Sequence, residues 1–282
     1  MLQHTVTSAD GTRLRVDETG DTSARPIIFI HGFSQSRLSW AKQMESDLAD
    51  DFRLIAYDLR GHGMSDVPAG GYTDSKAWAD DLRTVIDELE LDGAVPIGWS
   101  YGPLVILDYI RHHGEAKLGG FGMIGGVSKL GSDEAMSVLG QEFVALVPGF
   151  FSENPEEAKQ SLGELINICF APPPSGQEFA AMLEHSTAVP FFVRQGMFSR
   201  SFDNDDLLPR LKKPVLITHG TADRVVKPVA AEYHASAIPN AELHIVEGSG
   251  HAPFWDDPSA YNARLRSFCN SLDSAESVKS AA

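Results

Sequence analysis

Residues 98–102 read Gly-Trp-Ser-Tyr-Gly; the first two of them end the apolar run 94–99, and a helical pattern follows the motif. In this strand–turn–helix context, a Gly-x-Ser-x-Gly motif lifts the serine hydroxyl out of a sheet on a sharp, strained turn. Side chains two places before and after the serine would collide in such a turn, which accounts for Gly98 and Gly102. The N–H groups and the positive end of the following helix favour negative charge at the same point. The motif therefore predicts that Ser100 is a nucleophile.

The rest of the chain places this turn in an α/β sheet. Short continuous apolar runs are typical of strands buried on both faces of a parallel sheet. They occur at 27–30, 54–57, 94–99, 121–124, 215–218 and 243–246. Helical patterns lie between them at 40–48, 75–91, 104–110 and 229–237, and a last one follows them at 261–272. An Asp10-Gly11 turn within an alternating pattern adds a hairpin at the start. We expect a mostly parallel central sheet with antiparallel N-terminal strands and helices on both faces.

One long stretch breaks this alternation. Residues 128–210 contain no convincing strand, and their patterns are helical at 133–147, 155–169, 177–188 and 191–199. The stretch reads as a helical insertion in a core formed by residues 1–127 and 211–273. Nine of the chain's 15 phenylalanines fall within it. Residues 274–282 are small and polar and are predicted to form a flexible tail.

A serine nucleophile needs a base and an acid that orients the base. In this architecture the acid and then the histidine follow the serine in the chain, on loops after later strands. Asp223 lies just past the run 215–218, and His251 lies in a glycine-flanked loop just past 243–246. The sequence predicts these two residues as the orienting acid and the base. Backbone donors for an oxyanion are expected from the N–H of Tyr101 and from the N–H of Phe33.

Composition limits the possible functions. The 282 residues carry 23 basic and 39 acidic side chains, a net charge of −16, which disfavours nucleic acid and anionic membranes as partners. No apolar run approaches the ~18 residues of a membrane span, and the N-terminus lacks the pattern of a signal peptide. Cys169 and Cys269 read as two buried thiols of a cytoplasmic protein. No metal or cofactor motif is present, so no cofactor is expected. The oligomeric state is not predicted.

Taken together, these motifs resemble the α/β-hydrolase superfamily from about residue 11 to residue 272. His31-Gly32-Phe33 looks like its oxyanion loop, residues 98–102 match its nucleophile turn, and 219–223 and 250–253 match its acid and histidine loops. The insertion stands where the family has a helical cap. Haloalkane dehalogenases and epoxide hydrolases of this superfamily carry Asp as the nucleophile, unlike Ser100. The resemblance is therefore to carboxylesterases and cofactor-free haloperoxidases (perhydrolases).

This resemblance implies hydrolysis of carboxylic esters through an acyl-enzyme. The insertion carries 12 acidic and five basic residues, which favours a neutral, hydrophobic small-molecule ester. Phe33, Trp99, Phe143 and Phe192 are the expected substrate-binding side chains. A perhydrolase or a lactonase would use the same residues, and a ligand sensor on the same fold, with slow turnover, is the alternative from another class.

Overall fold

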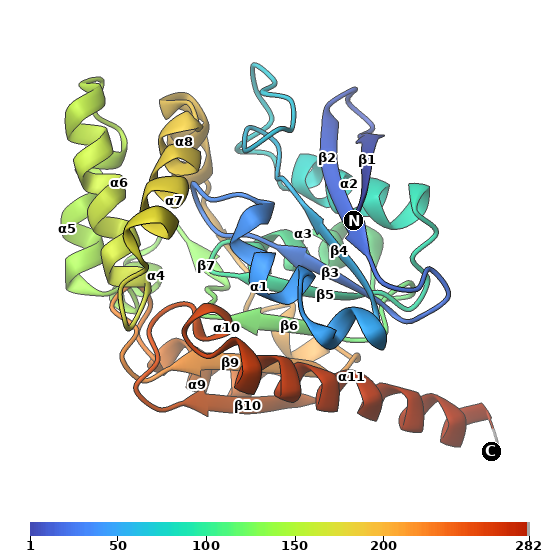
Figure 1. Ribbon diagram of the computed structural model, residues 1–282. Coiled ribbons are helices and arrows are strands. Elements are labelled where there is room, and N and C mark those ends of the chain that lie inside the picture. The colour runs from blue at the N-terminus through green and yellow to red at the C-terminus, as the bar shows by residue number, and fades with distance from the viewer. Residues whose placement is uncertain (281–282) are drawn as a thin grey trace.

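The computed structural model describes residues 1–280, with side chains described for residues 1–272. Its main sheet has eight strands in the order β1-β2-β4-β3-β5-β6-β9-β10 (Figure 1). The strands are β1 (Leu2–Thr7), β2 (Arg13–Thr19), β3 (Pro26–Ile30), β4 (Arg53–Tyr57), β5 (Val95–Trp99), β6 (Phe121–Ile124), β9 (Val215–Gly220) and β10 (Ala241–Val246). The β1–β2 and β2–β4 pairs are antiparallel, and the other pairs in this sheet are parallel. The predicted fold class is confirmed.

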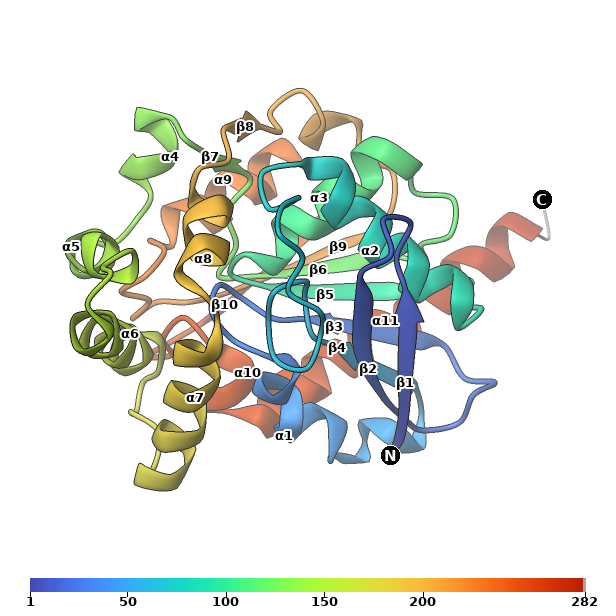
Figure 2. The same cartoon turned by 90° about the horizontal axis from the view of Figure 1, so that it is seen from above.

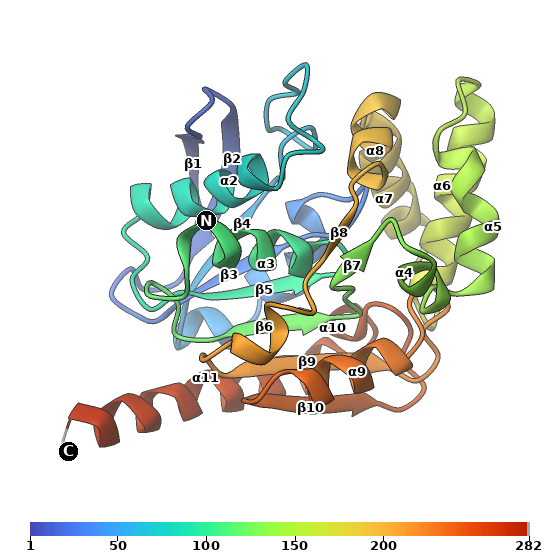
Figure 3. The ribbon, with the colours of Figure 1, turned by 180° about the vertical axis from the view of Figure 1, so that it is seen from behind.

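Helices cover both faces of this sheet, because its central strands are apolar on both sides. Every residue of β3 and β5 is buried. The helices outside the insertion are α1 (Ala41–Met44), α2 (Ser75–Glu88), α3 (Gly102–His113), α9 (Val229–Ala237), α10 (Pro253–Asp256) and α11 (Pro258–Ser280). Helices α1, α10 and α11 lie on one face, and α2, α3 and α9 lie on the other (Figures 2 and 3).

Five helices lie between β6 and β9 in the chain, and residues 128–210 are called the helical insertion below. The helices are α4 (Asp133–Ser137), α5 (Gln141–Phe150), α6 (Pro155–Cys169), α7 (Gly176–Ala188) and α8 (Phe191–Phe198). They stand beyond the carboxyl ends of the parallel strands (Figure 1). The expectation that this stretch lacks strands is wrong, because β7 (Lys129–Leu130) pairs with β8 (Phe202–Asp203). Two residues are too few to give a recognisable alternation.

Two of the predicted helices are broken. Residues 133–147 form α4 and α5, because the segment between them pairs with the core: Leu139 bridges to Val226, and the Gly140 N–H donates to the Val225 carbonyl at 2.9 Å. Residues 40–48 form only α1, flanked by 3-10 turns. The Ser46 hydroxyl starts the second of these turns by accepting a hydrogen bond from the Leu48 N–H.

The C-terminal region differs from the predicted tail. Helix α11 continues through residues 274–280, and residues 281–282 lie outside the described part of the chain. Both cysteines are buried, as the sequence predicts. Within residues 1–280, no helix has the length and apolar character needed to cross a lipid bilayer.

Candidate active site

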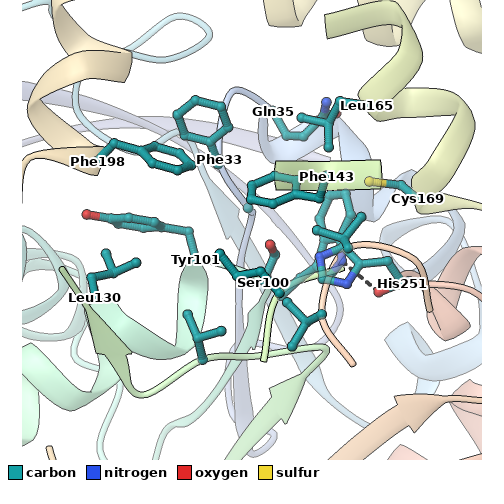
Figure 4. A pocket seen from close by; sticks show the side chains of 16 residues that line it. Phe33, Gln35, Ser100, Tyr101, Leu130, Phe143, Leu165, Cys169, Phe198 and His251 are labelled. Atoms are coloured by element: carbon teal, nitrogen blue, oxygen red, sulfur yellow. Dashed lines mark hydrogen bonds between the residues drawn. The ribbon is translucent and has the colours of Figure 1, made fainter. Parts of the chain in front are cut away.

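Ser100 sits on the turn between β5 and α3. Its φ of 58° lies in the left-handed region, which is unfavourable for a serine, and its N–H donates to the Ile124 carbonyl at 2.8 Å. A Cβ atom at Gly98 or Gly102 would lie 2.4 Å or 2.6 Å from neighbouring backbone atoms, so only glycine fits at either place. The turn therefore has the shape that the motif predicts. It directs the hydroxyl into a pocket at the start of α3 (Figure 4).

Asp223 and His251 come together at the same edge of the sheet. Asp223 follows β9 and His251 follows β10, and these strands pair in parallel. The His251 Nδ1 lies 2.8 Å from one carboxylate oxygen of Asp223. The other oxygen accepts the N–H groups of Val225 at 2.8 Å and Val226 at 3.0 Å. The carboxylate is thus fixed by its own loop and in turn fixes one nitrogen of the imidazole.

A second histidine supports this carboxylate. The His219 Nε2 lies 3.0 Å from the same Asp223 oxygen that faces His251 and 2.8 Å from the Val226 carbonyl. Both neighbours are acceptors, so the proton of the His219 ring belongs on Nε2. Burial alone would raise the pKa of Asp223, but the attraction of His251 and hydrogen bonds from both histidines hold that pKa well below its usual range. Asp223 is therefore ionised at neutral pH.

The His251 ring is held so that its second nitrogen is available. The backbone N–H of His251 donates to the carbonyl of Cys169, at the end of α6, at 2.8 Å. The backbone carbonyl of His251 accepts the indole N–H of Trp99 at 2.9 Å. The ring itself is buried, and its Nε2 has no hydrogen-bond partner among the described residues. His251 and Ser100 line the same pocket (Figure 4).

The loop after β3 brings Phe33 to the other side of Ser100. A Cβ at Gly32 would lie 2.9 Å from the Ser100 Cβ, so the two backbones are in close contact. Ser34 has a φ of 55° and is thus a second non-glycine residue of the site with a left-handed backbone. No acceptor within the described residues takes the N–H of Phe33 or of Tyr101. Both residues line the pocket beside Ser100.

The pocket above Ser100 is mostly apolar and has a free volume of about 60 Å³. Three of the four expected substrate-binding side chains line it, Phe33, Trp99 and Phe143. The fourth does not. Phe192, at the start of α8, is 39% exposed and packs against the ring of Tyr72, away from the pocket. Its place is taken by Phe198 at the opposite end of the same helix.

Comparison with known proteins agrees with this architecture. The family model described as "Alpha/beta hydrolase family" matches residues 27–264. The protein belongs to the α/β-hydrolase family.

Relatives of this α/β hydrolase include both haloperoxidases and esterases. The chain is 30% identical over 285 residues to a non-heme chloroperoxidase of Streptomyces lividans, covering 95% of this chain and 99% of that one. The crystal structure of the esterase RhEst1 from Rhodococcus sp. ECU1013 superposes with a TM-score of 0.92 at 38% identity, covering 96% of this chain and 100% of that chain. An esterase from Exiguobacterium antarcticum gives a TM-score of 0.82 at 27% identity, covering 95% and 99%.

Sequence reasoning missed two residues of the site in this α/β hydrolase. His219 lies near the end of β9, four residues before Asp223, and that spacing was the available signal. Phe198 could not be distinguished from Phe192, because both occur on one short amphipathic helix. Among the described residues, no group of three or more His, Cys, Asp or Glu side chains is placed to hold a metal ion.

Arg200 connects the helical insertion to the helix that follows Ser100. Its guanidinium donates to the Tyr101 hydroxyl at 2.9 Å and to the Asp108 carboxylate on α3 at 2.6 Å. Arg200 is buried, and its guanidinium also covers the Phe202 ring at 4.4 Å from the ring centre. Burial raises the pKa of Asp108 to about 7 despite the attraction of Arg200. The buried carboxylate therefore depends on this guanidinium as its counterion.

We expect Arg200→Met to lower the free energy of unfolding by about 3–5 kcal/mol, because it leaves the Asp108 carboxylate buried and unpaired. The double variant Arg200→Met/Asp108→Leu removes both charges and should recover most of that loss. Urea denaturation at pH 8 measures all three proteins. Equal instability of the single and double variants would show that the pair is not coupled.

Two buried histidines support the loops on the other side of the site. His31 accepts the Leu59 N–H on Nε2 at 3.0 Å, which ties the loop after β3 to the loop after β4. Its ring lies 5.1 Å from that of His62, whose Nδ1 is 2.9 Å from the Arg60 carbonyl. Burial lowers the pKa of His31 to about 4. Burial, with the neighbouring His31, lowers the pKa of His62 to about 3. Both rings are neutral in the folded protein near pH 7.

Because the pKa values of these two histidines are lowered, we expect the free energy of unfolding of this α/β hydrolase to fall in acid. The unfolded chain takes up a proton at His62 near pH ~6.5 and the folded protein does not, so stability present above pH ~6.5 is lost as the pH falls. His62→Asn keeps a side-chain N–H for the Arg60 carbonyl and does not titrate. Between pH 7 and pH 5 we expect the wild-type free energy of unfolding to fall by about 2 kcal/mol more than that of the variant. Parallel stability curves in urea titrations would contradict this.

Proposed function

We propose that the protein is a serine esterase that cleaves carboxylic esters of neutral, hydrophobic small molecules through an acyl-enzyme. One observation carries the proposal. His251 is bound to the ionised Asp223 through Nδ1, and it lines the same pocket as Ser100. Its Nε2 has no hydrogen-bond partner in the described part of the chain. An imidazole with one nitrogen fixed by a carboxylate and the other available is suited to accept a serine proton.

Acylation follows from these positions. The Ser100 oxygen attacks the ester carbonyl carbon while the His251 Nε2 takes the hydroxyl proton. The carbonyl oxygen becomes an oxyanion, for which the N–H groups of Phe33 and Tyr101 are the proposed donors. When the tetrahedral intermediate collapses, the carbon–oxygen bond to the alcohol breaks. His251 then returns its proton to the leaving alkoxide, and the acyl group stays on Ser100.

Deacylation repeats the same steps with water. His251 removes a proton from a water molecule, which attacks the acyl carbon and forms a second oxyanion at the same donors. Collapse releases the carboxylic acid, and the proton on His251 returns to Ser100. Asp223 stabilises the imidazolium in both half-reactions without taking its proton.

Charge and volume favour a small neutral substrate. The arginines of the helical insertion are already engaged, Arg194 by backbone carbonyls, Arg200 by Asp108 and Arg210 by Asp206. None is therefore offered to a substrate carboxylate. The apolar lining and the free volume of about 60 Å³ suit a short acyl chain.

We expect Ser100→Ala to reduce kcat with p-nitrophenyl acetate by about a million-fold, because the nucleophile and its base act as a unit. Release of p-nitrophenol is followed at 405 nm (roughly the absorbance maximum of the phenolate), and the melting temperature serves as the control for folding. An alanine variant with a tenth of the wild-type turnover would disprove the assignment of Ser100.

Asp223→Asn should keep the shape of the loop but lower kcat by roughly 10⁴, because it leaves His251 in the wrong tautomer. Asp133→Asn is the matched control, since Asp133 is the next carboxylate in the chain after β6 and is exposed at the start of α4. Wild-type rates in the Asp223 variant together with a collapse in the Asp133 variant would reassign the acid.

Perhydrolysis is a second candidate, favoured by the chloroperoxidase relative. Hydrogen peroxide would replace water in deacylation, so that the acyl group leaves as a peracid and Ser100 is regenerated. The assay adds hydrogen peroxide to the acetate reaction and follows bromide oxidation by the peracid. If the wild type forms peracid and the Ser100→Ala variant does not, peroxide competes with water at the same acyl-enzyme.

A further inference from the structure

A second cavity lies directly behind the wall of the active-site pocket. This side pocket, between α4, α9 and the segment after β6, is lined by Val127, Ala135, Val138, Val229, Ala230 and Tyr233, among others. Its free volume is about 210 Å³, compared with about 60 Å³ for the pocket above Ser100. The smaller of the two cavities is thus the one that holds the reactive serine.

The polar groups around the side pocket are satisfied within the protein. The Lys129 ammonium binds Glu134 at 2.9 Å and also binds Asp205. The His234 Nε2 lies 2.9 Å from the Ser128 hydroxyl, and burial lowers the pKa of His234 to about 4, so this ring is neutral. What the side pocket offers to a ligand is therefore its apolar surface, which suits a hydrocarbon chain and not a charged group.

The wall between the two cavities includes segments whose neighbouring residues line opposite cavities. Leu130 lines the active-site pocket while its neighbour Lys129 lines the side pocket, as expected for successive residues of a strand. In the same way, Leu139 faces one cavity and Val138 the other.

This wall is fixed to the core. The Lys227 N–H donates to the Val138 carbonyl at 2.8 Å. A Cβ at Gly140 would overlap the Arg224 carbonyl, so the segment has no room to shift toward the core.

Val127 is the one side chain that lines both cavities among the described residues. It is partly exposed although it packs against the hydrophobic core, as expected for a side chain with space on two sides. Removing its two γ-methyl groups would leave Cβ alone between a pocket too small for a long chain and a pocket large enough for one.

We propose that the side pocket is a subsite for the distal part of an unbranched alkyl chain of an ester substrate, and that Val127 determines how long a chain reaches it. This inference rests on the proposed esterase function. Burial of each further methylene contributes about a fourfold gain in kcat/KM, from ~0.8 kcal/mol per buried CH₂. Chain-length preference is therefore the property to measure.

The experiment compares p-nitrophenyl acetate, butyrate, hexanoate and octanoate. In Val127→Ala we expect the ratio of kcat/KM for octanoate over acetate to rise at least tenfold above the wild-type ratio. Leu165→Ala is the matched control, because Leu165 lines only the active-site pocket. It enlarges that pocket without opening the wall, so it should raise the ratio less than a third as much as Val127→Ala does. An equal gain in both variants would overturn the proposal.

A blocking variant tests whether the gain comes from the side pocket. Val127→Ala/Ala135→Leu fills the side pocket from α4 and should return the ratio to the wild-type value. Val229→Trp is the alternative block if the melting temperature shows that Ala135→Leu disturbs the fold, since Val229 is 50% exposed. A gain that survives both blocks would place the chain elsewhere and overturn the proposal.

Ligand binding separates this proposal from the esterase assignment. Calorimetric titration with 2-octanone and 2-butanone needs no turnover. Suppose that no ester is cleaved, but Val127→Ala binds 2-octanone at least tenfold tighter than wild type and the blocking substitution cancels this gain. The esterase assignment then fails, and the alkyl-chain subsite stands. If acetate is cleaved normally and neither the ester ratio nor ketone binding changes, the subsite alone fails.

Discussion

The left-handed backbone of Ser100 is the constraint on which the site depends. The conformation is unfavourable for a serine, and it persists because the surrounding backbone leaves no alternative. Gly98 and Gly102 pack against neighbouring backbone with no space for a side chain, and the Ser100 N–H is tied to the end of β6. Three parallel strands, β3, β5 and β6, must therefore be in register before the hydroxyl points into the pocket. The strain at one residue is sustained by the packing of the central sheet.

The second requirement is a buried carboxylate that stays charged. A carboxylate can be buried only if its oxygens are well supplied with donors. Asp223 has two backbone N–H groups on one oxygen and two imidazoles on the other. The backbone donors fix its position, and His219 supplies a donor that His251 alone would not. This arrangement gives His251 a definite tautomer and leaves its other nitrogen for Ser100.

The helical insertion is part of the site and not only a cover above it. Arg200 ties it to Tyr101 and Asp108, and the Gln35 side chain donates to the Ser186 hydroxyl on α7 at 2.9 Å. The end of α6 accepts the N–H of His251. The loops that carry Ser100, His251 and Phe33 thus contact the insertion directly or through one side chain. A change of position in these helices would therefore move Ser100, His251 and the proposed oxyanion donors together.

The sequence by itself determined the sheet, the order of its strands along the chain and the positions of Ser100, Asp223 and His251. These are local properties, because apolar runs, glycine spacing and the place of a residue after a strand can be read without knowing what lies opposite. Only the tertiary structure decided which phenylalanines face the pocket, since Phe192 and Phe198 have the same local pattern but lie at opposite ends of α8. It also decided that the predicted helix 133–147 is broken, because residues 138–140 pair with residues 225–227 of the core. The partner of Arg200, the second histidine on Asp223 and the side pocket behind Val127 have the same origin. Each depends on contacts between segments distant in the chain, and such contacts cannot be predicted from the residue pattern of any one segment.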